Sequence, residues 1–524
     1  MNNIEHFVEI GNALSTEKNH HALLEKILQR AMLLANADAG TIYSVTKNED
    51  ENQQALVFDT VLNNSLNYHL GGTSGNPIDF APINIYQHGE TNQSAMVAIA
   101  AATRDIINIE DVYASTHYDF TAAKAMDLRN NYHTKSVLTM PMQNHQQELN
   151  GVIQLINATD EQGNIIAFSE DVIRTISALT SFAAIILTNK QLIDSMEQLF
   201  ASFSQVIAAA IDRKSPYTGN HCRRVPEITM MLAQACHDVD NGPLQEFAMQ
   251  AEDFHELSVA AWLHDCGKVA TPEYVMDKSK KLETVFDRIA LVSARFEIAA
   301  RDITYSTKHS DIGKLSLLKT LESDRKFIEH ANTGGEFFDD EKINRVYKIA
   351  KHYKVSIAGV LQPILSEDEV HNLITKRGTL NPKERQIIND HMKVTIEMLE
   401  SMPFPKHLKN VPEYACGHHE KMDGTGYPKG LKRDEMSVQA RIMAIADIFE
   451  ALTSNDRPYK APKTLSETLT IMARMKLDQH IDPDLFDVFL EQKVYIKFAE
   501  KFLDSSQIDE VSINQLPGYE NYPK

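Results

Sequence analysis

The alternation of apolar and polar residues divides the chain into an α/β region and a longer helical region. Residues 21–40 carry apolar side chains at every third or fourth position, which predicts an amphipathic helix. Short apolar runs of strand-like composition follow, and they cover 40–45, 55–64, 83–87, 135–142 and 151–160. Residues 1–170 are therefore predicted to form an α/β domain.

A long helix is predicted for residues 171–213. Apolar residues step by three and four positions from Val172 to Ile186, and after a shift of phase near Lys190 they resume at Leu192. This heptad-like spacing favours a parallel coiled coil between two subunits, in which the shift of phase resembles a stutter. The alternative is a solitary helix packed on its own domain. As a hypothesis, the helix transmits the state of the N-terminal domain to the C-terminal region.

The composition is that of a soluble globular protein, with 43% hydrophobic and 24% charged residues among 524. This length predicts two or three domains. The net charge of −20 argues against binding to a nucleic-acid polymer or to an anionic membrane surface. An anionic substrate would need local cations, and bound metal ions are the natural source.

No membrane-spanning segment is expected. The longest apolar run, 177–188, is well short of the roughly 20 residues that span a bilayer. The first residues also lack the basic and apolar regions of a signal peptide, so a cytoplasmic location is predicted. The cysteines, Cys222, Cys236, Cys266 and Cys416, are then expected to be thiols, with apolar packing and redox control of activity as alternative roles.

Two adjacent pairs of potential metal ligands stand out in the second half of the chain. The first pair begins HDCGK, with Lys268 three residues beyond the aspartate, and the second begins HHEKMDGTGYP. Histidine nitrogens and carboxylate oxygens suit divalent iron, manganese and zinc. Such pairs in Gly-containing segments are hard to explain as core packing, so a metal site is predicted. Its candidate ligands are His221, His264, Asp265, His391, His418, His419 and Asp447.

The order of these motifs resembles the HD-GYP family of phosphodiesterases, a branch of the HD superfamily. HDCGK, HHE followed by DGTGYP, and RIMAIADIFEALTSNDRPYK at 441–460 occur in the family's order within about residues 205–500. The resemblance implies an all-α HD-GYP domain that hydrolyses cyclic di-GMP to pGpG, and it leaves open whether the product is cut further to GMP.

The same resemblance implies the roles of individual residues. The seven ligands would hold two divalent ions, with iron or manganese expected, and Asp265 can bridge them. Asp265 and Lys268 are the expected catalytic residues, with Lys268 as a donor to the phosphate. Tyr217 stands where some members carry a glutamate that helps to hold a third ion, which favours two ions here. The expected substrate contacts are Gly426, Tyr427, Pro428, Arg457 and Lys460.

The N-terminal pattern, above all SVLTMPM followed by GVIQLINA, resembles a GAF domain, in which an antiparallel sheet carries helices and a ligand pocket. GAF domains that bind cyclic nucleotides often carry an Asn-Lys, Phe and Asp-Glu signature. Here Asn157 precedes Ala158 and Phe168 precedes SEDV, so cyclic-nucleotide binding is not expected. A sensor of another ligand and a ligand-free dimerisation domain remain alternatives.

The stretch between Asp265 and His391 is far longer than the few dozen residues usual in the family. Its helical pattern predicts an inserted helical subdomain over about 280–370. A passive elaboration of the fold, a lid and a dimer contact are alternative roles. Residues 501–524 are assigned to a C-terminal tail.

The expected molecule is a metal-dependent cyclic di-GMP phosphodiesterase, regulated by the GAF-like domain. A homodimer joined through the connecting helix is expected, and its signalling partners stay open. One alternative is hydrolysis of another cyclic dinucleotide. Another is a receptor that binds cyclic di-GMP without turnover and signals through partner proteins, although the retained HD pair, Lys268 and GYP loop argue against it.

Overall fold

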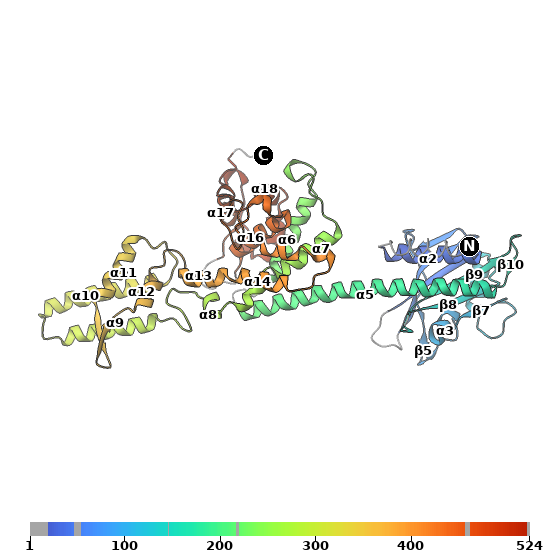
Figure 1. Ribbon diagram of the computed structural model, residues 1–524, viewed down its shortest axis with the longest axis horizontal. Helices are drawn as coiled ribbons and strands as arrows, with labels where there is room; N and C mark the ends of the chain where they lie inside the picture. Colours follow the sequence, from blue (N-terminus) through green and yellow to red (C-terminus); the bar gives the residue numbers. More distant parts are fainter. Residues whose placement is uncertain (1–18, 47–53, 145, 216–219, 456–461, 521–524) are drawn as a thin grey trace. The chain divides into compact units, whose positions relative to one another are not determined.

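The computed structural model describes residues 19–46, 54–144, 146–215, 220–455 and 462–520 (Figure 1). It divides into two compact units, Met1–Leu199 and Phe200–Lys524. The first combines an antiparallel sheet with helices, and the second is mainly helical. The predicted fold class, an α/β domain followed by a long helix and a helical C-terminal region, is confirmed.

The main sheet of the N-terminal unit has the strand order β3-β2-β1-β9-β8-β7, and every pairing in it is antiparallel. Side chains alternate between its two faces. Ile153 and Leu155 of β9 therefore enter one core cluster, while Val152 and Ile156 pack on the opposite face. The strands are β1 (Ala37–Val45), β2 (Ala55–Asn63), β3 (Tyr68–Gly71), β4 (Ile83–Asn84), β5 (Tyr86–Gln87), β6 (Glu90–Thr91), β7 (Ile107–Ile109), β8 (Val137–Gln143), β9 (Leu149–Thr159) and β10 (Ile165–Ile166).

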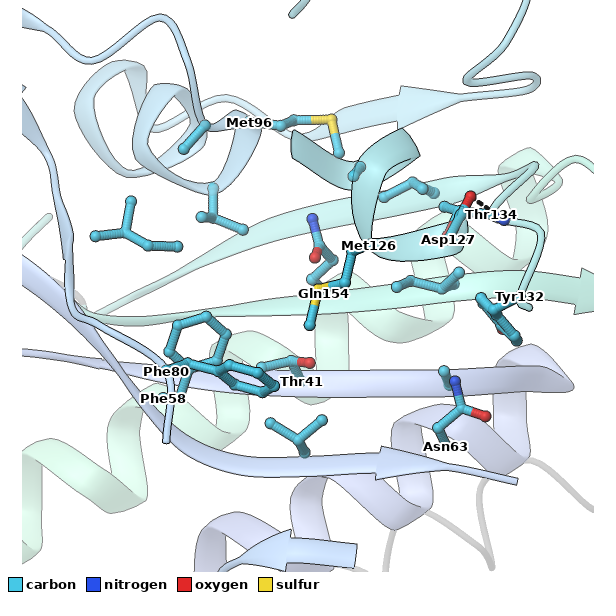
Figure 2. Close-up of a pocket in the computed structure, with 18 of the residues that line it drawn as sticks. Thr41, Phe58, Asn63, Phe80, Met96, Met126, Asp127, Tyr132, Thr134 and Gln154 are labelled. Carbon is cyan, nitrogen blue, oxygen red and sulfur yellow. Dashed lines mark hydrogen bonds between the residues drawn. The ribbon is translucent and has the colours of Figure 1, made fainter. Parts of the chain in front are cut away.

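Helix α2 (His20–Ala35) covers one face of this sheet, where Leu24 and Leu28 are buried. It begins with the Asn19 side chain accepting from backbone N–H groups, and it ends at Asn36 in the left-handed conformation. The predicted helix is therefore present but stops before residue 40, where β1 has already begun. The other face carries α3 (Met96–Thr103), which packs on β8 and β9. Helix α4 (Thr121–Asn130) lies over the same face (Figure 2).

Helix α5 (Glu170–Lys214) is continuous through the predicted shift of phase. In its first half Ile176, Leu179 and Leu187 are buried in the core shared with α2. In its second half five large apolar side chains are exposed, Leu192, Met196, Leu199, Phe203 and Val206, before Ala208 and Ile211 enter the C-terminal core.

By length and composition alone, α5 is long and apolar enough to cross a membrane. The sequence pattern predicts no such segment, because the longest apolar run, 177–188, is shorter than a membrane span. Packing against the N-terminal sheet accounts for much of the apolar character of the first half of α5. The absence of a membrane span and the cytoplasmic location stay predictions.

The C-terminal unit is organised around one large apolar cluster. It is built from the end of α5, α6 (His221–His237), α7 (Ala251–Leu263), α14 (His391–Glu400), α15 (Val411–Cys416), α16 (Val438–Thr453), α17 (Leu465–Leu477), α18 (Pro483–Glu491) and α19 (Val494–Phe502). Leu516 and Tyr519 are also buried in it. The segment assigned to a separate tail from residue 501 is therefore part of this core. Its short, irregular turns carry no helical or strand periodicity that a sequence pattern could show.

A second, smaller core holds the inserted segment together, from Leu282 to Leu373. Its elements are α9 (Ile289–Tyr305), α10 (Asp311–Asn332), α11 (Asp340–His352), β11 (Lys354–Ile357), β12 (Val360–Pro363) and α12 (Glu367–Leu373). Two short helices flank it, α8 (Glu273–Met276) and α13 (Pro382–Asn389). The hairpin β11–β12 was absent from the all-α prediction. Its tight turn uses Ala358 and Gly359, both at positive φ, which suits a two-residue hairpin loop.

Candidate metal centre

Three histidines of the C-terminal unit are held in the same way by the end of a helix. Nδ1–H of His264, His391 and His418 donates to a carbonyl three residues earlier, at 2.7, 2.5 and 2.7 Å. Those carbonyls, of Ala261, Ile388 and Ala415, lie in the last turns of α7, α13 and α15, where carbonyls lack partners within the helix. The bond fixes the tautomer, so Nε2 of each ring is left with a free lone pair.

His221, the first residue of α6, is oriented by a carboxylate instead. Its Nδ1 bonds Oε2 of Glu450, whose other oxygen accepts from Nε of Arg224 at 2.6 Å. Glu450 lies on α16, one helical turn beyond Asp447, and is 1% exposed. A carboxylate behind a ligand histidine is the usual support of such a ligand, because it fixes the ring and raises its basicity. Nε2 of His221 is again the atom directed inward.

The inward atoms meet around Asp265. Its Oδ2 lies 3.1 Å from Nε2 of His264 and 3.2 Å from Nε2 of His221, and its Oδ1 lies 3.3 Å from Nε2 of His391. Asp447 approaches from α16, with Oδ1 3.3 Å from Nε2 of His221. Six of the seven predicted ligands thus form two groups, and within each group the ligand atoms lie within 4.8 Å of one another: His221, His264 and Asp265, and His391, His418 and His419. The seventh, Asp447, lies beside the first group through its contact with His221.

These residues fit a divalent metal. Nε2 of His264, His391 and His418 and Oδ1 of Asp265 are buried, with no hydrogen-bond partner among the described residues. Buried polar atoms without partners are costly, so native proteins seldom keep several together unless a ligand satisfies them. A set of imidazole nitrogens and carboxylate oxygens suits iron, manganese or zinc.

The protonation of Asp265, His418 and His419 favours ligation, whereas the carboxylates of Glu450, Asp265 and Asp447 outweigh burial and raise the pKa of His221, which must lose a proton to bind a metal. Burial alone would raise the pKa of Asp265, but Lys268 and the neighbouring histidines outweigh it and hold the pKa well below its usual range. Burial lowers the pKa of His419 to about 4, and it lowers the pKa of His418 well below its usual value, aided by His419 and His264. At neutral pH the carboxylate is therefore ionised and these two imidazoles are neutral, as metal binding requires.

Lys268 is the cation of the centre. Its Nζ lies 2.5 Å from Oδ2 of Asp265. Although burial would lower the pKa of Lys268, the carboxylates of Asp265 and Asp447 raise it, so the ammonium stays charged. Gly267 lets this segment pack on α14, since a Cβ there would lie 2.0 Å from the carbonyl oxygen of His391.

The loop after His419 is tied down by Glu420. This buried carboxylate accepts from the backbone N–H groups of Lys429, Gly430 and Leu431 at 2.7, 3.1 and 2.9 Å. Gly426 has no room for a side chain, because a Cβ would lie 2.4 Å from the backbone nitrogen of Lys421. The ring of Tyr427 stacks on His419 with centroids 4.8 Å apart.

Other predicted residues lie outside the described part of the chain. These are Arg457, Lys460 and Tyr217. Sequence reasoning missed Glu450, Arg224 and Glu420. Their signal was present only as letters beside the predicted ligands: Glu450 ends ADIFE, Arg224 is the second arginine of HCRR, and Glu420 ends HHE.

The four cysteines are buried thiols. Burial raises the pKa of Cys266 and Cys416 to about 12, so neither forms the reactive thiolate near neutral pH. This favours apolar packing over redox control.

Comparison with known domain families gives two matches. Residues 348–485 match the model of the HD domain, and residues 19–187 match the model of the GAF domain. The first match contains His391, His418, His419 and Asp447. The remaining candidate ligands, His221, His264 and Asp265, precede it.

Curated relatives match only part of their length. A probable cyclic di-GMP phosphodiesterase from Vibrio cholerae is 40% identical over 25% of this chain and 31% of its own. The same bacterium has a 3'3'-cGAMP-specific phosphodiesterase 3 that is 39% identical over 22% of this chain and 24% of its own. A cyclic di-GMP phosphodiesterase from Thermotoga maritima is 35% identical over 23% and 32%. The chain thus spans less than a third of each relative.

Proposed function

We propose that this chain, which carries a GAF domain and an HD domain, is a metal-dependent phosphodiesterase that hydrolyses cyclic di-GMP to pGpG. The proposal is carried by one observation: buried Nε2 atoms of His264 and His391, without hydrogen-bond partners among the described residues, lie within 3.3 Å of the carboxylate of Asp265. The names of the relatives from Vibrio cholerae and Thermotoga maritima support the class of reaction.

The chain's own residues would hold two divalent ions, iron or manganese. The two oxygens of Asp265 face different histidines, which supports a bridging role between two positions. His221, His264, His391, His418, His419 and Asp447 supply the other donor atoms. Bound ions would supply Lewis-acid polarisation of a phosphodiester and a water of lowered pKa.

Lys268 and the loop after His419 would bind the substrate. Lys268 keeps its charge and is partly exposed, so its ammonium is available to a phosphate beside Asp265. The rigid loop of Gly426, Tyr427 and Pro428 would place an aromatic ring against a base, since Tyr427 is already held by stacking on His419. Arg457 and Lys460 would add charge on the substrate phosphates.

A second candidate substrate is 3'3'-cGAMP, because one relative is named as specific for it. The two dinucleotides differ in one base. The same ligands and Lys268 would therefore serve both, and only contacts to the base would discriminate.

The test is turnover of both dinucleotides by anaerobically purified protein reconstituted with Fe(II) or Mn(II). Chromatography separates linear product from GMP. We expect metal-dependent product from cyclic di-GMP that is lost in Asp265→Ala and kept in Asp434→Ala, an exposed carboxylate outside the centre. Faster turnover of 3'3'-cGAMP would favour the second substrate. Tight dinucleotide binding by fully metallated protein without product would instead establish a receptor.

Dimerisation through α5 would couple the GAF domain to this site. The exposed apolar side chains Met196, Leu199, Phe203 and Val206 follow three- and four-residue steps, as in a coiled-coil seam. Leu199→Glu combined with Phe203→Glu should shift sedimentation from dimer to monomer. The neighbouring change Gln198→Glu should leave the dimer intact.

A further inference from the structure

The N-terminal unit contains a cavity of about 480 Å³. It lies on the sheet face opposite α2, with Thr41 and Gln154 on its floor and α3 and α4 across from them (Figure 2). Its size is within the usual range of small-molecule sites, roughly 300 to 1,000 Å³.

The walls are largely apolar and carry aromatic rings and thioethers that suit an aromatic ligand. Tyr43, Phe58 and Phe80 form a row of rings, with successive centroids 4.7 and 5.1 Å apart. Figure 2 shows Phe58 and Phe80 at one end of the cavity, with the thioether side chains of Met96 and Met126 on the side of the helices. Ring faces and polarisable sulfur atoms both favour contact with an aromatic ligand.

The cavity is unsuited to an anion. Among its described lining residues there is no lysine, arginine or histidine, and the charged ones are Asp79, Asp119 and Asp127. A phosphate or carboxylate here would lose its hydration, find no cation and face three carboxylates.

The cavity is equally unsuited to a buried cation. Asp127 is the buried carboxylate of the three, and it already accepts from Tyr113 Oη at 2.9 Å and from N and Oγ1 of Thr134 at 2.8 Å each. Asp79 and Asp119 are exposed at the edge, where water screens them. No lining side chain described here has a buried polar atom without a partner.

We infer that this cavity binds an uncharged, planar aromatic molecule of about two or three fused rings, held by shape and dispersion rather than by ion pairs. This assigns the N-terminal unit a ligand class that excludes nucleotides. It stands independently of the chemistry proposed for the C-terminal unit.

The test is calorimetric titration of the full chain with two probes of nearly equal shape, methyl naphthyl ketone and naphthoate, and with cyclic GMP. We expect the ketone to bind at one site per chain, and naphthoate and cyclic GMP to bind at least about tenfold more weakly. Equal or tighter binding of either anion, or no binding of the ketone up to about millimolar concentration, would overturn the inference.

Two variants on α4 place the binding in this cavity. Ala123 lines it and Ala125, on the same helix, does not. Ala123→Trp should weaken ketone binding at least about tenfold, whereas Ala125→Trp should not change it. Unchanged binding in a folded Ala123→Trp protein would contradict the assignment.

A third variant changes the charge preference. Met126 lines the cavity and is 44% exposed, so a lysine there can keep its ammonium hydrated. Met126→Lys should tighten naphthoate binding relative to the ketone by about tenfold. An unchanged ratio would contradict a site within reach of this side chain.

Discussion

In the N-terminal cavity the buried carboxylate has hydrogen-bond donors on both oxygens, whereas in the C-terminal centre several buried nitrogen and oxygen atoms have no partner among the described residues. Asp127 accepts three hydrogen bonds, while Nε2 of His264, His391 and His418 accepts none from the described residues. Folding can retain such unsatisfied atoms because a bound ion satisfies them. The two proposals thus rest on opposite observations, a fully bonded carboxylate for a cavity that selects by shape and partnerless donor atoms for a centre that selects a charged ion.

The largest effect is expected from removing one unsatisfied donor. His418→Ala should lower turnover at least about a thousandfold and reduce the bound metal, because a buried nitrogen ligand is lost. Parallel measurements of metal content and turnover check this. His352→Ala, an exposed histidine of the insertion, is the matched control. Full metal content in His418→Ala would show that this ring is not a ligand.

A smaller effect on turnover is expected from changing Glu450, the carboxylate that orients the candidate ligand His221. Glu450→Gln removes the charge that orients His221 and should weaken metal binding by about 10- to 100-fold. Turnover should recover at high metal concentration, which would separate lost affinity from lost chemistry. An activity loss that added metal does not reverse would place Glu450 in a different role.

In the cavity, removing the buried carboxylate should lower the stability of the N-terminal unit rather than the affinity for ligand. Asp127→Ala leaves the buried backbone N–H and hydroxyl of Thr134 without their acceptor and should lower the free energy of unfolding by roughly 2 kcal/mol. Chemical denaturation of the N-terminal transition measures this. Asp79→Ala, at the exposed edge, should be neutral. If the two variants had equal stability, the bonded network would contribute little.

The insertion provides an intermediate case, a buried cation that meets two carbonyls and, at 4.0 Å from its centroid, the ring of Phe338, but no carboxylate among its described contacts. Lys281 is 1% exposed and donates to the carbonyls of Leu373 and Thr375 at 2.9 and 2.8 Å. Burial, with Lys342 nearby, lowers the pKa of Lys281 to about 8. The pKa of Lys281 is lower in the folded than in the unfolded chain, so burying the charged form destabilises the insertion fully below about pH 8. This destabilisation is relieved as the folded chain loses the proton, and stability rises up to about pH 10.5.

We expect this gain to be roughly 2 kcal/mol between pH 7.5 and 10. Hydrogen exchange of α9 and α10 across this range measures it. Lys281→Met should remove the dependence, because a neutral chain of similar length has no proton to lose. A slope that persisted in Lys281→Met would assign it to another group.

The sequence was most informative where chemistry needs particular residues. The two adjacent pairs were recognisable because paired histidines and aspartates have few structural explanations, and the resemblance to the HD-GYP family supplied His221, His391 and Asp447. The structure brings these seven candidates together, and their role as ligands stays a prediction. Glu450 and Glu420 were not predicted, because a carboxylate that supports a ligand or anchors a loop looks like any other polar residue of a helix or turn. The burial of Tyr519 was also missed, since tertiary contacts rather than local periodicity fix its position.

The cavity was accessible from the sequence only as a property of a resembling fold. Its ligand class depends on which side chains of β1, β9 and α4 face one another, and on the bonding of Asp127. Pairing across the sheet brings Thr41 beside Gln154 from distant parts of the chain. The residue spacing within β1 or β9 does not predict which residues of the two strands pair.

The bonds from His264, His391 and His418 to helix-end carbonyls mean that each ring is also the cap of a helix. Replacing such a residue therefore loosens α7, α13 or α15 even when no ion is present. Unfolding measured in chelator isolates the capping contribution, and the further loss seen with metal belongs to ligation. Because the orientation comes from the main chain, the surrounding side chains can vary while the ring directions persist.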